Sequence, residues 1–170
     1  MRRSLSLLTL FALAACDSSV AHRSSGAAAF EAARAKRAAP EREWRSYLND
    51  GQHSPLTQID RANARELRIA WEYAAGGAGS GTQVQTNPLV VNGVLYGISP
   101  ALRAFALDAA TGAELWSFDP AARERPGLAP SRGLAYWASG DDERVFFGAG
   151  VHLWALNART GEPIAGFGDG

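Results

Sequence analysis

The sequence predicts an all-β chain, and two observations support that prediction. First, residues 88–118 break into four short apolar runs of four to six residues, separated by turn-forming residues. Runs of this length are typical of strands and are too short for helices. Second, the segment ALDAATG at residues 106–112 returns 49 residues later as ALNARTG at residues 155–161. A period near fifty residues, built from four short strands, is typical of a β-propeller blade.

The strands expected in the first repeat are residues 88–91, 94–99, 103–107 and 113–118. Asn92-Gly93 separates the first two and predicts a type I′ hairpin turn, because both central residues of that turn need φ > 0. The second repeat has expected strands at residues 134–138, 144–148 and 151–156. An ordinary β-sandwich with two similar hairpins is the alternative, and the periodicity favours the propeller over it.

Two further elements are expected before the first repeat. Residues 59–65 are predicted to form a turn or short helix. Residues 67–73 are predicted to form a strand that places Leu67, Ile69 and Trp71 on one face.

Composition and length restrict the possible partners and the extent of the fold. The 170 residues carry 17 Lys and Arg against 17 Asp and Glu, so no basic surface points to nucleic acid as a partner. Two repeats cannot close a propeller, whose rings need about 4–8 blades. We therefore expect a truncated propeller at residues 43–170, holding the first two to three blades of a longer protein.

The N-terminus predicts export. A basic start and a short uncharged apolar run at residues 1–15 indicate a signal peptide rather than a membrane span. The run ends in Leu-Ala-Ala before Cys16, the only cysteine, and resembles a lipoprotein lipobox with Cys16 as the lipidated residue. A plain secretory signal is the alternative. Residues 16–42 are then a flexible tether, partly helical and with solvated charges, which places the protein on the periplasmic side of the cell membrane.

Five segments resemble the pyrroloquinoline quinone (PQQ)-dependent dehydrogenases of the glucose and alcohol type. They are W-x-x-Y…S-P-L-x-Q-I…A-W-x-Y (44–73), V-Q-T-N-P-L (84–89), A-x-D-x-x-T-G-x-x-x-W (106–116), S-R-G-L-A-Y-W (131–137) and G-F-G-D-G (166–170). The resemblance implies an eight-bladed propeller, in which the tryptophan of each blade packs against the next blade. Trp71, Trp116, Trp137 and Trp154 are accordingly expected in the core or between blades.

The resemblance also implies the chemistry. It suggests an oxidoreductase of the EC 1.1 class that oxidises an alcohol or sugar hydroxyl and passes electrons to ubiquinone or a cytochrome. PQQ would be the cofactor, with calcium as a Lewis acid. Because the family's calcium ligands and catalytic Asp come from later blades, no catalytic or metal residue is expected here, and this portion alone is expected to be inactive.

Two residues are the candidates for the cofactor site. Arg132 matches an arginine that contacts PQQ, and a guanidinium suits the carboxylates of that planar tricarboxylate. Gln85 stands where the family has an acidic residue near the quinone, and it supplies hydrogen bonds without charge.

The sequence also departs from the family pattern. The vicinal Cys pair of the alcohol dehydrogenases is absent at residues 126–130. Asn157 replaces Asp108 and Ala165 replaces Trp116 in the second repeat, so its docking motif looks degraded. Asp119, Asp141 and Asp142 are better explained by solvated turns than by a metal cluster.

The alternative function is a non-catalytic, PQQ-like propeller lipoprotein that acts as an envelope assembly scaffold. The Arg132 segment and the W-x-x-Y…SPL opening favour the dehydrogenase over it, because a scaffold has no use for them.

Overall fold

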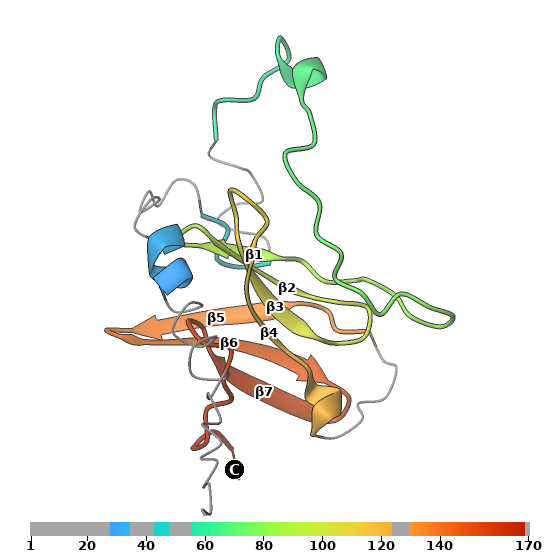
Figure 1. Cartoon of the computed structure of the whole chain (residues 1–170), viewed down its shortest axis with the longest axis vertical. Coiled ribbons are helices and arrows are strands. Elements are labelled where there is room, and N and C mark those ends of the chain that lie inside the picture. Colours follow the sequence, from blue (N-terminus) through green and yellow to red (C-terminus); the bar gives the residue numbers. More distant parts are fainter. Residues whose placement is uncertain (1–27, 35–42, 48–55, 124–129, 169–170) are drawn as a thin grey trace, which may run out of the picture.

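The computed structural model describes residues 28–34, 43–47, 56–123 and 130–168, which form two antiparallel sheets (Figure 1). The first sheet has the order β1-β2-β3-β4 and the second β5-β6-β7, so each is a meander of sequential neighbours. Their bounds are β1 Leu89–Val91, β2 Val94–Ile98, β3 Ala104–Asp108, β4 Glu114–Phe118, β5 Leu134–Ser139, β6 Asp142–Ala149 and β7 His152–Asn157. The predicted all-β class and the seven strands predicted within the two repeats are confirmed.

The hairpin between β1 and β2 has the predicted turn. Asn92 and Gly93 have φ of 51° and 77°, and Val91 pairs with Val94 across them. Both central residues are thus left-handed, as a type I′ turn requires. Residues 43–47 run along the free edge of β1, where Trp44 exchanges backbone hydrogen bonds of 2.7 and 2.9 Å with Val90.

The core lies between the two sheets. Alternate residues of β6 are buried, among them Val145 and Phe147, because successive side chains of a strand point to opposite faces. They meet Tyr96 from β2, whose ring lies 6.0 Å from Trp116 and 6.1 Å from Tyr136. The sheets therefore stack face to face as neighbouring blades do.

Two tryptophans make the same contact with successive turns. Trp116 donates its indole N–H to the Ala158 carbonyl at 2.9 Å, and Trp71 donates to the Ala109 carbonyl at 3.3 Å. Each ring also covers the glycine that ends the turn: a Cβ built on Gly161 or Gly112 would lie 2.6 Å from it. The interpretation of Trp71 and Trp116 as blade packing is confirmed.

The other two tryptophans differ from each other. Trp154 packs 5.0 Å from Phe118 of the first sheet, as expected for a residue between blades. Trp137 is 46% exposed on the outer face of the second sheet, with the Arg144 guanidinium 5.5 Å from its ring centre. Within the described part of the chain Trp137 is therefore neither core nor inter-blade packing.

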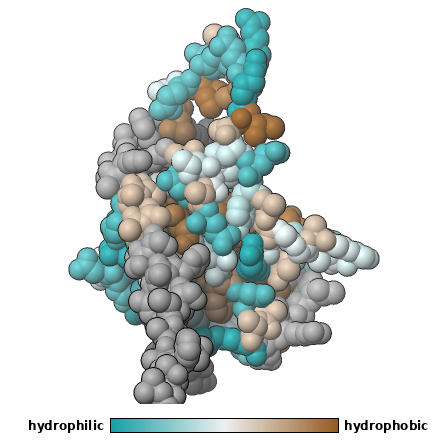
Figure 2. Space-filling model, in the orientation of Figure 1, coloured by the Kyte–Doolittle hydropathy of each residue, from teal (hydrophilic) through white to brown (hydrophobic). Residues whose placement is uncertain are grey.

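The strand predicted at residues 67–73 is wrong. The segment forms no ladder, and the described residues offer it no partner strand. Leu67 and Ile69 are 58% and 79% exposed on an arm that projects from the sheets, and Figure 2 shows apolar side chains there. The arm does contain the predicted helical turn, the 3-10 helix η2 (Ala64–Glu66).

The second sheet has only the start of a fourth strand. Leu156 bridges Pro163, and the Ile164 N–H donates to the Ala155 carbonyl at 2.9 Å. The turn before it is intact despite Asn157, whose side chain accepts from the Arg159 and Thr160 N–H groups at 2.9 and 3.2 Å. The prediction of a degraded docking motif is therefore wrong for this turn. The second repeat still has no tryptophan at the position equivalent to Trp116, because Ala165 stands there.

Residues 28–34 are helical, as expected for part of the segment before the propeller. Phe30 and Ala33 are only 2% and 3% exposed and belong to the core cluster. Arg34 forms an ion pair with Glu143 at 2.5 Å. The expectation that the charges here are solvated is wrong for Arg34, because the helix packs against the blades, whereas Glu31 remains exposed. Residues 1–15, Cys16 and most of the expected tether at 16–42 lie outside the described residues.

Candidate functional site

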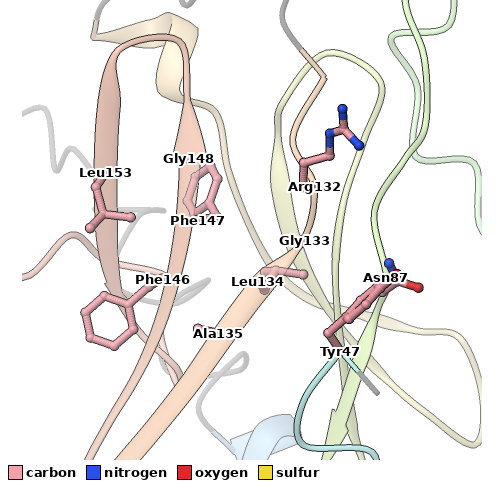
Figure 3. A pocket seen from close by; sticks show the side chains of 10 residues that line it. All are labelled: Tyr47, Asn87, Arg132, Gly133, Leu134, Ala135, Phe146, Phe147, Gly148 and Leu153. Atoms are coloured by element: carbon pink, nitrogen blue, oxygen red, sulfur yellow. The ribbon is translucent and has the colours of Figure 1, made fainter. Parts of the chain in front are cut away.

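The segments that precede β1 and β5 lie side by side. Asn87 comes two residues before β1, and Gly133 immediately precedes β5. A Cβ built on Gly133, where φ is 148°, would lie 3.9 Å from the backbone of Asn87. Figure 3 shows Arg132, Gly133 and Asn87 on these neighbouring segments. The fold thus brings residues that are about 45 positions apart in the sequence to one end of the two sheets.

A cleft of about 340 Å³ opens at this end. Its polar side chains come from Tyr47, Asn87 and Arg132, and Phe146 and Leu153 lie at its other side (Figure 3). The remaining lining residues are Gly133, Leu134, Ala135, Phe147 and Gly148. A cationic and amide-bearing side facing an aromatic side suits a flat anionic ligand, since the guanidinium binds carboxylates and the rings contact its plane.

Arg132 has its charge available for such a ligand. It is exposed, and within the described part of the chain it makes no ion pair. Arginines at the other end of the second sheet are already paired: Arg34 and Arg159 with Glu143, and Arg144 with Asp142. The structure therefore places Arg132 in a cleft, and its contact with a cofactor stays a prediction.

Gln85 is not in the same cleft. It is exposed and donates its amide to the Gln83 side chain at 2.6 Å. Its neighbours Val84 and Thr86 line a second, apolar cleft of about 310 Å³ on the face of the first sheet turned away from the second. Gln85 and Arg132 lie at the same end of the sheets, since Asn87, two residues after Gln85, lines the cleft of Arg132. Their side chains do not meet.

Thr86, which lines the second cleft and precedes Asn87 of the first, has an unusual hydroxyl. Its Oγ1 is buried and has no hydrogen-bond partner among the described residues. Buried polar atoms are normally paired, so such an atom marks a position where a partner is expected.

Asn87 and Tyr47 are site residues that the sequence reasoning did not select. For Asn87 a signal was present, because it follows Gln85 and Thr86 directly before the first strand, as Arg132 and Gly133 precede β5. For Tyr47 the only signal was its place in the W-x-x-Y opening. Trp44 fixes it by pairing with Val90, which directs the chain along β1 towards the cleft.

A polar cluster holds the chain that leads to Gln85. Arg103 donates to the Tyr73 hydroxyl at 3.0 Å and to the Ala75 carbonyl at 3.1 Å. Tyr73 in turn donates to Glu114. Burial, together with the hydrogen bond and charge of Glu114, raises the pKa of Tyr73 to about 12. The cluster therefore stays neutral at the tyrosine and fixes the start of the 76–86 loop.

Two of the three acidic residues considered as a metal cluster, Asp119 and Asp142, have other partners. Asp119 caps the 3-10 helix η3 (Pro120–Ala122) by accepting from the Ala121 N–H at 2.9 Å. Asp142 pairs with Arg144 at 2.6 Å, and that hydrogen bond lowers the pKa of the carboxyl. No group of three His, Cys, Asp or Glu in the described residues is placed to hold a metal ion. The prediction that calcium ligands come from other blades stays a prediction.

These features define a class: a stack of propeller blades with an arginine at the entrance to the cleft between their first strands. The sequence of residues 42–170 matches the PQQ family described as glucose/ethanol/alcohol dehydrogenase, beta-propeller domain. The chain belongs to this family, and PQQ with a metal ion are the cofactors that the family implies.

Similar proteins agree with that assignment. The chain is 37% identical over 134 residues to the dehydrogenase subunit of an alcohol dehydrogenase (quinone) from Gluconobacter oxydans, covering 72% of this chain and 16% of that subunit. It is 34% identical over 131 residues to a 1-butanol dehydrogenase (cytochrome c) from Thauera butanivorans, covering 72% of this chain and 18% of that protein. The chain thus spans less than a fifth of either relative.

Solved structures show the same likeness. The quinohemoprotein alcohol dehydrogenase from Comamonas testosteroni superposes with a TM-score of 0.62 at 28% identity, over 85% of this chain and 22% of that one. A europium-containing methanol dehydrogenase gives 0.57 at 26% identity, over 72% and 22%. The predicted propeller fold is confirmed.

Within the described residues, no helix has both the length and the apolar composition to cross a bilayer.

Proposed function

We propose that this chain is the N-terminal part of an exported, lipid-anchored PQQ-dependent dehydrogenase that oxidises an alcohol or sugar hydroxyl. The observation that carries the proposal is the position of Arg132, which is exposed and has no ion pair among the described residues, beside Asn87 in a cleft where the segments before β1 and β5 meet. The scaffold alternative gives no role to an uncompensated guanidinium at this position.

The residues present fit the cofactor. Arg132 would bind a carboxylate of PQQ, and the Asn87 amide would donate to another oxygen at the same rim. When bound, PQQ would accept the two electrons removed from the substrate, and the protein would supply its position and electrostatics.

The electron acceptor is proposed from the relatives. One is described as a quinone-dependent alcohol dehydrogenase and another as a cytochrome c-dependent 1-butanol dehydrogenase. We infer that the complete protein passes its electrons to ubiquinone or a cytochrome. Calcium ligands and the base would come from blades outside residues 43–170, so this portion alone would not turn over.

The experiment that tests cofactor binding uses the full-length protein with PQQ and Ca²⁺. We expect Arg132→Ala to weaken PQQ binding by 10- to 100-fold, since a charge-assisted hydrogen-bonded contact contributes about 1.5–3 kcal/mol. Arg132→Lys should restore part of it, because the charge remains without the bidentate fork. Arg68→Ala is the matched control: Arg68 is exposed and bonds only to the Leu67 carbonyl among the described residues. Equal PQQ affinity in the Arg132→Ala and control variants would refute the role of Arg132.

Export and anchoring require a separate measurement. The mature protein isolated from native membranes should have the mass of a chain beginning at Cys16 plus lipid, and Cys16→Ser should release it into the periplasmic fraction. Retention of the Cys16→Ser protein in the membrane would rule out this anchor. A mass several times that of residues 16–170 would show that the propeller continues and closes.

A further inference from the structure

The helix at residues 28–34, which we name the strap, joins the two sheets. Its Phe30 and Ala33 are 2% and 3% exposed and lie in one cluster with Val91 and Val94 of the first sheet and Val145 of the second. Burying a phenylalanine side chain removes its apolar surface from water and so favours the docked position. The strap is therefore part of the folded domain.

Charges hold the strap in addition to apolar contact. Arg34 pairs at 2.5 Å with Glu143, whose side chain is only 4% exposed. The same carboxylate accepts from the Tyr136 hydroxyl at 2.9 Å and from Arg159 at 3.4 Å, and Arg159 reaches back to Glu31 at 3.3 Å. A buried carboxylate without these partners would be costly, so the network favours the docked strap.

The strap lies at the opposite end of the blades from the cleft. Glu143 pairs with Ala138 near the end of β5. Leu134, the first residue of β5 and close in sequence to Arg132 of the cleft, pairs with Phe147. The four residue steps from Glu143 to Phe147 span about 13 Å. Likewise Val91 ends β1 and Asn87 precedes it. Figure 1 shows the helix beside the far ends of β1 and β5.

Docking shortens the connection to an anchor at Cys16. From Cys16 to residue 28 are 12 residues, which reach at most about 43 Å when fully extended. From Cys16 to residue 43 are 27 residues, with a reach of about 97 Å. A strand of eight residues such as β6 is already about 27 Å long. A flexible connection of 12 residues has a root-mean-square length of only about 17–21 Å. To present the cleft end to the membrane, it would have to stretch well beyond that length along the blade.

We propose that the strap sets the orientation of the protein on the lipid surface, with the strap end facing the bilayer and the cleft end facing the aqueous phase. This rests on the proposed lipid anchor at Cys16. The surface facing the lipid is the end of the sheets that carries the strap and the turn between β5 and β6. The cleft of Arg132 then opens towards soluble substrates rather than towards the membrane.

The test measures energy transfer from the protein to an acceptor lipid in vesicles that hold the full-length protein by its own anchor. A fluorescent amino acid replaces either Asp141 or Val151. These residues are exposed in the turns at opposite ends of β6, and Val151 is 93% exposed. We expect transfer from position 141 to be about twofold or more higher than from position 151, since the short connection limits the distance of the strap end from the bilayer.

Two variants lengthen the connection in different ways. An insertion of about fifteen Gly and Ser residues after Ser25 leaves the strap sequence intact and adds a flexible spacer. Phe30→Ser undocks the strap, which hydrogen exchange at residues 28–34 reports directly. Both should reduce the difference between positions 141 and 151. Ala32→Ser, on the exposed side of the same helix, is the control and should leave the difference unchanged.

Each outcome decides something different. Equal transfer from the two positions in the unaltered protein, while hydrogen exchange shows the strap docked, would overturn the orientation. An unchanged difference in the insertion variant would overturn the role of the short connection, even if Phe30→Ser failed to fold. A protein that does not remain on the vesicles at all would instead refute the lipid anchor of the proposed function.

Discussion

The indole of Trp116 lies directly on Gly161 of the next sheet, so closely that a Cβ at that glycine would be 2.6 Å from the ring. The same indole donates its N–H to the Ala158 carbonyl at 2.9 Å. One tryptophan thus contacts both ends of the four-residue turn Ala158–Gly161 in the neighbouring blade. Trp71 does the same with Ala109 and Gly112, so this contact repeats from blade to blade.

Replacing the covered glycine should be costly. Gly161 has φ of 72°, so Gly161→Ala would strain the backbone by about 1–2 kcal/mol and also displace the indole, for a total near 3 kcal/mol. Gly140→Ala is the matched control, because Gly140 has φ of 59° but nothing within 4 Å of a Cβ. Urea unfolding of both variants measures the difference. Equal losses would mean that the indole contact adds nothing.

The indole hydrogen bond can be tested separately. Trp116→Phe removes the donor to a buried carbonyl and should lower the free energy of unfolding by about 1–3 kcal/mol. Trp71→Phe should cost less, since its bond is longer at 3.3 Å and the side chain is only partly buried. A larger loss at Trp71 than at Trp116 in urea unfolding would contradict this order.

The two turns should tolerate exchange of their first residue. Asp108 accepts from the Ala110 and Thr111 N–H groups at 2.8 and 3.0 Å, as Asn157 does in the second repeat. Asp108→Asn should therefore be nearly neutral, whereas Asp108→Ala should cost about 1 kcal/mol. Thermal unfolding of the two variants, measured side by side, distinguishes them. A large loss with Asn would show that the charge matters.

The carboxylate of Glu143 should be strongly coupled to Tyr136. Burial and the hydrogen bond to Glu143 raise the pKa of Tyr136, in keeping with a neutral hydroxyl that donates to a buried anion. Tyr136→Phe should cost about 1–2 kcal/mol, and it should cost much less once Glu143→Gln is present. A double-mutant cycle by urea unfolding gives the coupling. Additive losses would mean that the two groups act independently.

Stability should fall in alkali, in part through Tyr73. Its pKa is about 12 in the folded protein against an ordinary value of 10, so folding favours the neutral phenol. The contribution is fully present below pH 10 and is lost as the pH rises from 10 to 12. Tyr73→Phe should flatten the fall in unfolding free energy across this window, with tyrosinate absorbance reporting the titration. An ordinary pKa at Tyr73 would exclude this residue as a source of the loss of stability.

The sequence alone determined the local structure, because its signals are local. Turn residues such as Asn92-Gly93 fix φ within a few positions, and short apolar runs fix the strands between them. The 49-residue repeat was enough to predict the blades, and Arg132 could be selected because its segment is distinctive. These local signals do not identify which distant residue a given residue contacts.

The tertiary structure decided those partners. The segment at 67–73 has a strand pattern, but a strand needs a neighbour, and the described residues supply none. Gln85 belongs to a distinctive motif, yet Asn87 is the residue that shares the cleft with Arg132, because the fold brings the Asn87 backbone, and not Gln85, beside Gly133. Arg34 of the strap looked solvated in sequence and is held by Glu143, more than a hundred residues away. Pairing, burial and ion pairs depend on which distant surfaces the fold brings together.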